Sequence, residues 1–378
     1  MDFTFSEEQQ MLLDTARRFV ARDYSFETRR QIKEQSPEGF SRPVWQGLAD
    51  LGLLALNVPE ADGGLGGGAI ETMLAMNAIG EGLLLEPFLA SAVLATRAIA
   101  ALGNDAQRAE LLPALAAGEK IAVLAHDEPA TRFDRMAVET RAWPVGSGYV
   151  LTGHKGVITH GACADVLLVT ARLAREGEPG PLAVFAVPRD TSGLRQVAYR
   201  TVDGVAAGEL WFNQVFVPAA ALLGNGGDAQ AQVEQVLDAG LAAVCAEAVG
   251  ALDKLLAATV EYARNRKQFG QPIGKFQALQ HRMADMVLHI EQARSMSYLA
   301  AVRCVDADPA VRRRALSAAK VVTGQACRFV GQQAVQLHGG MGVTDELDVS
   351  HYFKRLMAIE LQFGSTDHHL ESYAAQLA

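Results

Sequence analysis

The first 120 residues carry apolar positions at the spacing of amphipathic helices. Four of these positions near the start would share one helical face: Leu12, Ala16, Phe19 and Val20. Ser6 and Gln9 form a capping-box pattern just before them, and Phe5 occupies the position of a hydrophobic staple. The pattern predicts further helices over 43–53, 69–84, 86–102 and 104–117. Pro59 and the glycine-rich run 63–68 interrupt this helical region.

The pattern changes between residues 121 and 223, where short alternating or apolar runs are separated by Gly, Pro and Asp. The clearest runs are 149–151, 166–169, 182–187 and 209–212. Runs of this length between turn residues indicate β-strands. Because no helical segment lies between them, an antiparallel sheet or barrel is expected rather than a parallel sheet.

Helical periodicity returns after the glycine-rich segment 224–227. The stretches 229–264, 276–305 and 309–336 are long and rich in alanine, which is typical of antiparallel helices in a bundle. The sequence therefore predicts an α+β protein of three parts. These are a helical N-terminal domain over 1–120, a central antiparallel β-domain (barrel or sandwich) over 121–225, and a C-terminal helical bundle over 226–378.

Composition narrows the possible partners and the compartment. The 378 residues are 49% hydrophobic and 20% charged, with a formal charge of −9, which argues against nucleic acid or an anionic membrane as the main partner. The four cysteines form no CxxC pair, and the start lacks the features of a signal peptide. No uncharged apolar run reaches the roughly 18 residues of a membrane span. A cytoplasmic protein is the resulting expectation.

Two glycine-rich stretches resemble nucleotide motifs without fitting them. Gly64-x-Gly66-x-x-Ala69 has the dinucleotide spacing, but Glu81 falls in an apparently helical stretch instead of at the end of a second strand, so an interhelical loop is expected. The segment 270–276 is one residue short of a P-loop and has Phe276 where Ser or Thr must bind Mg²⁺. No zinc-ligand spacing and no GxSxG nucleophile elbow is present.

Two segments of the C-terminal part remain as candidates for binding. In the first, residues 262–277, Arg266 follows one helix and Gln277 begins the next. Its guanidinium could neutralise a pyrophosphate, or it could simply compensate the dipole at a helix C-terminus. The second runs from Gln336 to Gly342, and its three glycines after a long helix either permit close approach of a ligand or form a glycine C-cap.

Together these segments resemble the acyl-CoA dehydrogenase family, over the whole chain. The matching motifs are Arg-Lys-Gln-Phe-Gly-x-Pro-Ile-Gly-x-Phe-Gln at 266–277 and Gln-Leu-His-Gly-Gly-x-Gly at 336–342. The resemblance implies a C-terminal four-helix bundle and FAD as the cofactor. It also implies contacts with the ADP part of FAD from one subunit through Arg266, Phe269 and Gln277, and from a neighbouring subunit through Gln336, Gly339 and Gly340.

In the β-domain the resemblance places Val157-Ile158-Thr159 against the flavin ring, with Thr159 as a hydrogen-bonding residue and Val157 where the family usually has an aromatic residue. It also makes Ser365 a cofactor-binding residue. The family's Thr-Glu-Pro-Gly-Ala-Gly-Ser-Asp loop corresponds to Asp127-Glu128-Pro129 followed by a different stretch to Asp134.

The implied reaction is α,β-dehydrogenation of an acyl-CoA thioester. A carboxylate removes the α-proton, a hydride leaves the β-carbon for flavin N5, and electrons pass to an electron-transfer flavoprotein. The family's Tyr-Glu-Gly-Thr-Ser-Glu aligns on 362–367, which puts Phe363 at the position of the catalytic glutamate. The alternative base position in the family falls on Gly240. The catalytic residue therefore stays unassigned, because neither side chain can take a proton.

Four carboxylates lie near these positions in sequence and are expected to be structural or solvated: Glu234, Asp238, Glu360 and Asp367. The ending 363–370 and the stretch 351–356 most resemble the small subunits of pimeloyl-CoA-type dehydrogenases. Three hypotheses follow. The chain is a flavin-dependent subunit of a hetero-oligomer whose partner supplies the base, a non-catalytic subunit that stabilises an active partner, or a self-sufficient enzyme with a displaced carboxylate. The expected assembly is a homo- or heterotetramer with another acyl-CoA dehydrogenase subunit.

Overall fold

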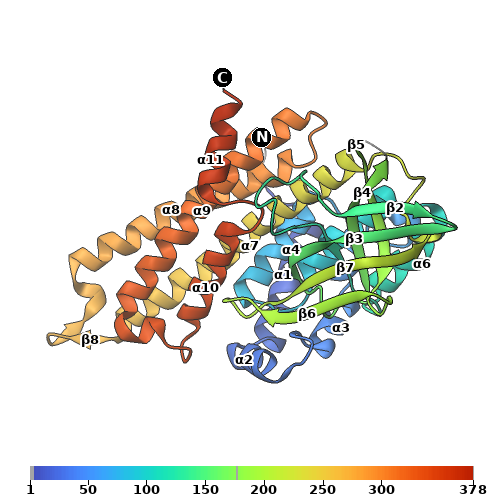
Figure 1. Cartoon of the computed structure of the whole chain (residues 1–378). Helices are drawn as coiled ribbons and strands as arrows, with labels where there is room; N and C mark the ends of the chain where they lie inside the picture. Colours follow the sequence, from blue (N-terminus) through green and yellow to red (C-terminus); the bar gives the residue numbers. More distant parts are fainter. Residues whose placement is uncertain (1–3, 176–177, 378) are drawn as a thin grey trace. The chain divides into compact units, whose positions relative to one another are not determined.

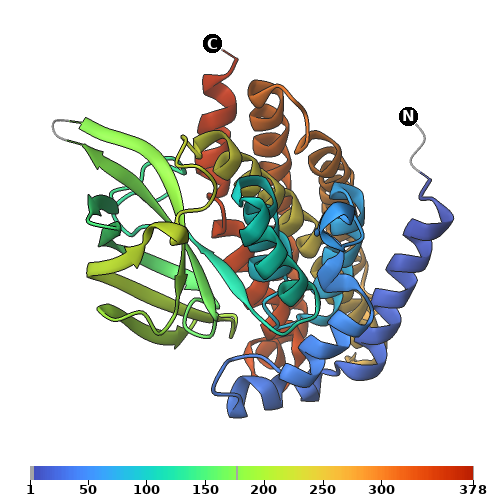
Figure 2. The same cartoon turned by 90° about the vertical axis from the view of Figure 1, so that its right-hand side faces the viewer.

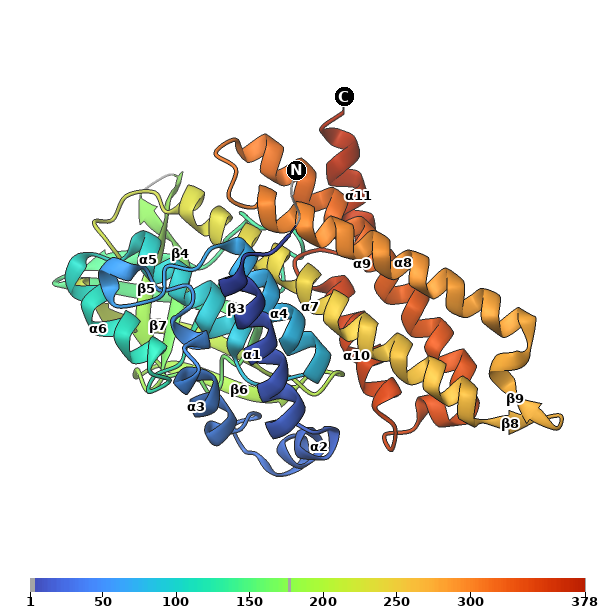
Figure 3. The same ribbon diagram turned by 180° about the vertical axis from the view of Figure 1, so that it is seen from behind.

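The structure is a computed structural model that describes residues 4–175 and 178–377, shown as ribbons in Figures 1, 2 and 3. It forms two compact units. The first, here called the bundle unit, comprises Met1–Arg29, Ala69–Leu84 and Leu241–Ala378. The second, the sheet unit, comprises Arg30–Gly68 and Leu85–Gly240.

The bundle unit is built from long helices. They are α1 (Glu7–Asp23), α4 (Ala69–Gly82), most of α7 (Gln230–Asn265), α8 (Gln277–Arg303), α9 (Pro309–His338), α10 (Asp348–Leu361) and α11 (Thr366–Ala375). Helix α9 packs against α8, α10 and α11, and α1 packs against α4. Figure 1 shows α8, α9 and α10 side by side, in orange to red, and the turn of β8 and β9 at one end of them.

Local sequence signals explain where several of these helices begin and how closely they approach. Ser6 and Gln9 form the predicted capping box at the start of α1. Asp308 caps α9 through its side chain, and proline is the first residue of that helix. Helices α4 and α7 pack through glycines, because a Cβ on Gly80 would lie 2.0 Å from the carbonyl oxygen of Glu247.

Shorter helices and a seven-stranded sheet make up the rest of the chain. The helical segments are α2 (Phe26–Gln35), α3 (Arg42–Asp50), the 3-10 turns η1 (Leu53–Ala55) and η2 (Glu60–Asp62), the π-helical η3 (Phe88–Ala95), α5 (Thr96–Leu102) and α6 (Asp105–Ala116). The strands are β1 (Ala122–Ala125), β2 (Arg141–Val145), β3 (Gly148–Thr159), β4 (Val166–Arg175), β5 (Glu178–Pro188), β6 (Leu194–Arg200) and β7 (Ala206–Pro218).

The strands follow the order β1-β4-β2-β3-β7-β6, and β5 pairs with β4. Four pairs are antiparallel: β2 with β3, β3 with β7, β4 with β5, and β6 with β7. Strand β4 instead runs parallel to both β1 and β2. Figure 2 shows the strands curling as one sheet. The predicted fold class, with helical N-terminal, central β and C-terminal bundle parts, is confirmed. The two parallel pairs were not expected, since β4 inserts between strands that precede it in the chain.

The rejected dinucleotide motif lies where an interhelical loop was expected. Residues 63–68 connect the 3-10 turn η2 to α4, and residues 4–62 contain no strand. Glu81 lies inside α4 and forms an ion pair with Arg17 of α1 (2.6 Å). The acidic residue is thus used to join two helices.

Candidate functional site

The segment after α7 forms a hairpin at one end of the bundle unit. Strands β8 (Lys267–Gln268) and β9 (Gln271–Pro272) pair, so Phe269 and Gly270 make a two-residue turn. Both have positive φ angles, 52° and 78°, as in a type I′ turn. The Phe269 side chain is 91% exposed. The turn therefore presents an aromatic ring to solvent from a backbone conformation that a phenylalanine rarely adopts.

Arg266 and Gln277 lie on the two sides of this hairpin. The backbone N–H of Arg266 donates to the carbonyl oxygen of Tyr262 (2.8 Å) and ends the last turn of α7, while its side chain is exposed. Gln277 is the first residue of α8, and the preceding Phe276 offers no side-chain cap. The first N–H groups of this helix are thus not capped by a side chain, and such groups favour an anion.

Gln336, Gly339 and Gly340 lie at the end of α9 and the start of the 3-10 turn η6 (Gly339–Val343). A Cβ on either glycine would meet no atom within 4 Å, so their backbone is open to close approach. Tyr262 connects this segment to the end of α7: its ring centroid is 4.4 Å from that of His338, and its hydroxyl donates to the His338 carbonyl oxygen (3.4 Å). Both predicted segments thus lie at one end of the bundle.

The free groups of this end fit the ADP part of FAD. Within the described residues, the side chains of Arg266, Gln277 and Gln336 have no hydrogen-bond or ion-pair partner. A guanidinium fork matches a pyrophosphate, open glycine backbone permits close contact, and an exposed ring can stack on a base. The chemistry of this donor set therefore suits a dinucleotide. Contact with one flavin from two subunits stays a prediction.

The two predicted hydroxyl contacts have different local settings. Thr159 ends β3, pairs with Ala207 of β7 and is half-buried. Ser365 is the N-cap of α11, and its Oγ accepts a hydrogen bond from the N–H of His368 (3.3 Å). The Ser365 hydroxyl still has a proton to donate, so its predicted role in cofactor binding stays open as a prediction.

Phe363, at the expected position of the base, is half-buried and packs against an apolar cluster. Its side chain contacts a buried cluster made of Leu241, Ala242, Cys245, Ala300, Cys304, Leu316 and Ala319. Its φ angle is 59°, an uncommon value for a residue with a side chain. Gly240, the alternative base position, is buried inside α7. The structure places no proton acceptor on the side chain of either residue.

The loop that carries Phe363 is held by hydrogen bonds to its carbonyl groups. Lys320 is fully buried, and its Nζ donates to the carbonyl oxygens of Glu360 (2.8 Å) and Gly364 (2.7 Å). Burial lowers the pKa of this ammonium group. The ring of His369 lies with its Nε2 2.9 Å from the carbonyl oxygen of Phe363, to which it can donate. The backbone around position 363 is therefore fixed from two sides.

Three of the four nearby carboxylates are bound by structural partners or exposed. Asp238 is almost fully buried and pairs with Arg135 (2.9 Å). Glu360 accepts hydrogen bonds at Oε1 from the N–H of Thr366 (3.0 Å) and from Arg328 (3.3 Å). Asp367 is exposed in the first turn of α11. These observations agree with the structural or solvated roles expected of Asp238, Glu360 and Asp367, while the role of Glu234 stays a prediction.

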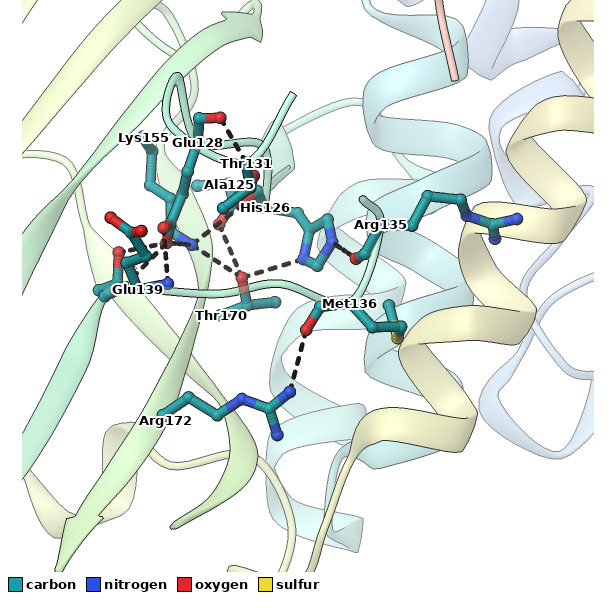
Figure 4. Close-up of polar contacts among 11 residues, drawn as sticks. Ala125, His126, Glu128, Thr131, Arg135, Met136, Glu139, Lys155, Thr170 and Arg172 are labelled. Atoms are coloured by element: carbon teal, nitrogen blue, oxygen red, sulfur yellow. Dashed lines mark hydrogen bonds and ion pairs between the residues drawn. The ribbon is translucent and has the colours of Figure 1, made fainter. Parts of the chain in front are cut away.

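A buried polar network in the sheet unit was not found from the sequence (Figure 4). Lys155 is fully buried, and its Nζ donates to Glu128 Oε1 (2.6 Å), Thr170 Oγ1 (3.0 Å) and the carbonyl oxygen of His126 (3.0 Å). Glu128 Oε1 also accepts from the Thr140 hydroxyl (2.6 Å). All three ammonium protons thus have acceptors, which a buried charge requires.

His126 extends the network toward the loop that follows Glu128. Its Nε2 donates to the carbonyl oxygen of Arg135 (2.5 Å), so its Nδ1 is free to accept from the Thr170 hydroxyl (3.1 Å). Burial, with Lys155 nearby, lowers the pKa of His126 to about 4, and burial lowers the pKa of Lys155 to about 8. In the sequence, the one indication of this buried network is the presence of polar residues within otherwise apolar strands.

The described part of the chain holds no group of three His, Cys, Asp or Glu side chains that could bind a metal ion. Nor does any described helix combine the length and apolar character needed to cross a membrane. All four cysteines are buried and none forms a disulfide within the described residues.

Comparison with known proteins covers nearly the whole chain. Three family models match it: acyl-CoA dehydrogenase N-terminal domain at residues 6–119, middle domain at 124–215 and C-terminal domain at 229–378. The "Probable acyl-CoA dehydrogenase YngJ" of Bacillus subtilis is 30% identical over 97% of this chain and 97% of its own length.

Solved structures are similar over the same extent. A chain of the ChsE4-ChsE5 complex from Mycobacterium tuberculosis is 29% identical with a TM-score of 0.88, covering 100% of this chain and 99% of that one. A structure described as PigA with FAD and proline is 26% identical with a TM-score of 0.89, again covering 100% of this chain and 99% of that one.

Proposed function

Because the chain belongs to the acyl-CoA dehydrogenase family, we propose that it is a flavin-carrying subunit whose catalytic base comes from a partner chain. It is an FAD-dependent oxidoreductase of the kind that acts on the CH–CH groups of acyl-CoA. FAD, when bound, supplies the acceptor for the hydride. The reaction is α,β-dehydrogenation of an acyl-CoA thioester, and an electron-transfer flavoprotein is the proposed electron acceptor.

In this proposal both candidate segments, residues 262–277 and 336–342, bind the cofactor. Arg266 neutralises the pyrophosphate, Phe269 and Gln277 contact the rest of the ADP part, and Gln336 with its two following glycines meets the same group from a neighbouring subunit. Thr159 and Ser365 donate hydrogen bonds to the flavin. The free side chains at the end of the bundle support these roles, since a guanidinium and two amides are left there without partners among the described residues.

The observation that carries the proposal is the packing of Phe363. Its ring contacts an apolar cluster, and the carboxylates of Asp238 and Glu360 are held by other groups. A base must lie within hydrogen-bond reach of the proton it removes. The chain therefore retains groups that fit the cofactor while its two expected base positions carry no acceptor.

The proposed assembly is a heterotetramer with a second acyl-CoA dehydrogenase subunit, of the type formed by small subunits of pimeloyl-CoA dehydrogenases. The similarity to a chain from a complex of two named components, ChsE4 and ChsE5, supports an assembly of unlike chains. A displaced carboxylate in this chain is not favoured, given the partners of Asp238 and Glu360.

The test begins with the chain purified alone and with its co-expressed partner. We expect the assembled complex to be yellow and to bleach with acyl-CoA under anaerobic conditions, and the chain alone to be yellow and unreactive. Phe363→Glu should allow the chain alone to be bleached by acyl-CoA. The control Phe363→Gln should not, because its amide has the size of the glutamate side chain but cannot act as a base. Bleaching of the unmodified chain alone would overturn the proposal. A chain that never carries flavin, even in the complex, would instead indicate a stabilising, non-catalytic subunit.

A further inference from the structure

Strand β3 contains a strained residue at the start of the stretch proposed to face the flavin. Val157 has a φ angle of 55°, and His160, three residues later, has one of 58°. A β-branched residue at positive φ is a genuine outlier, because its Cβ crowds the backbone. Such residues persist only where their surroundings force the conformation, and they gather at functional sites.

The strain coincides with a β-bulge in the pairing of β3 with β7. Lys155 pairs with Leu210 and Ile158 pairs with Gly208, so three steps along β3 match two steps along β7. The extra residue is accommodated opposite Glu209. Bulges of this kind redirect the side chains that follow them. Here the bulge determines how Ile158 and Thr159 are presented.

Glu209 fills the space at the bulge with its carboxylate. Oε1 accepts hydrogen bonds from the backbone N–H of Val157 (3.2 Å) and from the hydroxyl of Tyr199 (2.9 Å). Oε2 lies 2.5 Å from Nε2 of His154, which donates to it. Burial, and after it the hydrogen bond to the Glu209 carboxylate, raise the pKa of Tyr199 to about 12, so its hydroxyl stays protonated. Tyr199 and His154 thus fix the carboxylate that holds the strained N–H.

The neighbouring backbone contacts hold the flanks of the bulge and not its centre. The N–H of Gly156 donates to the carbonyl oxygen of Asp127 (3.0 Å), and that of His160 donates to Ala206 (2.7 Å). A Cβ on Gly156 would lie 3.2 Å from Glu209 Oε2 and 2.7 Å from Pro129 Cγ, which explains the glycine there. The Glu209 carboxylate, together with the Tyr199 hydroxyl that it orients, instead contacts the backbone N–H of Val157 itself.

We infer that Glu209 is a positioning residue for the flavin: by holding the Val157 N–H it fixes the bulge that presents Ile158 and Thr159 to the isoalloxazine ring. This inference rests on the proposed function, in which that stretch contacts FAD. Glu209 itself touches no reacting atom. Its effect passes through the backbone conformation of Val157, so a change that relieves the strain at Val157 should make the carboxylate dispensable.

The experiment compares Glu209→Ala, Val157→Gly and the double variant in the assembled complex. Glu209→Ala should weaken FAD retention at least about tenfold, as loss of a hydrogen bond to a charged acceptor implies. Val157→Gly is the reference that accounts for loss of this side chain beside the flavin, and glycine adopts positive φ without strain. The double variant should retain FAD to within about threefold of Val157→Gly, because the unstrained backbone no longer needs the carboxylate. Asn213→Ala, an exposed change on the same strand, is the matched control and should have no effect.

Three readouts separate the possible outcomes. Flavin absorbance per chain after dialysis gives retention, the flavin midpoint potential reports the position of the ring, and hydrogen exchange at the 156–160 amides reports the bulge without flavin. Equal FAD retention in Glu209→Ala and the unmodified complex would overturn the inference, as would a double variant no better than Glu209→Ala. An unmodified complex without any FAD would instead refute the proposed function, while faster exchange in Glu209→Ala would still show the bulge to depend on this carboxylate.

Discussion

His126 should make the stability of the sheet unit depend on acid. The imidazole is buried and neutral, with Nε2 donating to the Arg135 carbonyl oxygen and Nδ1 facing the Thr170 hydroxyl. Burial, together with the ammonium group of Lys155, lowers its pKa to about 4 in the folded protein. In the unfolded chain the pKa returns to about 6.5. Between these two values the unfolded chain binds more protons, so stability falls as the pH falls.

The size of the effect follows from the two pKa values. The contribution of His126 is fully present above a pH of about 6.5 and is lost as the pH falls through about 4. At 1.36 kcal/mol for each unit of difference, the whole effect is about 3 kcal/mol. About 2 kcal/mol of it should be lost between neutral pH and a pH near 5. That loss is a large fraction of the stability of an ordinary domain.

Urea unfolding followed by tryptophan fluorescence reports the stability of the sheet unit, which contains His126. The chain has 3 tryptophans, Trp45, Trp143 and Trp211, and all belong to the sheet unit. His126→Gln keeps a donor for the Arg135 carbonyl group but cannot titrate, so its stability should fall by about 2 kcal/mol less over the same pH interval. His281→Gln, at an exposed position of α8, is the matched control. Equal pH dependence of His126→Gln and the unmodified protein would refute the reasoning.

Two further changes test the binding end and the packing of the bundle unit. Arg266→Ala should lower FAD retention in the assembled complex, because it removes a guanidinium that has no partner within the described residues. Retention is measured as flavin absorbance per chain after dialysis, and unchanged flavin content would contradict the role of Arg266. Gly250→Ala should destabilise the bundle by about 1–3 kcal/mol in denaturant unfolding followed by circular dichroism, because its Cβ would lie 2.0 Å from the Asn77 carbonyl oxygen. Gly227→Ala, with no atom within 4 Å of the added Cβ, should be neutral, and equal effects of the two would count against the packing argument.

Helix positions could be predicted because their signals are local. The capping pattern of Ser6 and Gln9 needs only four consecutive residues, and the structure contains it. Helix α2 (Phe26–Gln35) was missed, since its ten residues are mostly polar and show no apolar stripe. The placement of β4 between β1 and β2 also escaped prediction, because strand order depends on contacts between distant segments. The domain limits at 120 and 225 remain predictions.

In the candidate site, too, some residues could be located from the sequence and others could not. Its glycines and guanidinium stand in two short motifs, so a resemblance could locate them. The network of Lys155 joins residues far apart in sequence: Glu128 is 27 residues away and Thr170 is 15, while His126 and Thr170 are separated by 44. Such partners meet only after the strands have paired. The pKa values of these groups therefore follow from tertiary structure alone.

The backbone conformation around Phe363 does not depend on the side chain at that position. The contacts that fix its loop use backbone carbonyl groups, bound by Lys320 and His369, and the adjacent Gly364 has a φ angle of 112° that favours glycine. The side chain at 363 adds only apolar contacts to this arrangement. A glutamate there would be held by the same backbone, and its apolar neighbours would raise its pKa toward the range in which a base is effective. The loop thus holds residue 363 in place whichever of these side chains it carries, so Phe363→Glu tests the missing carboxylate and not the fold.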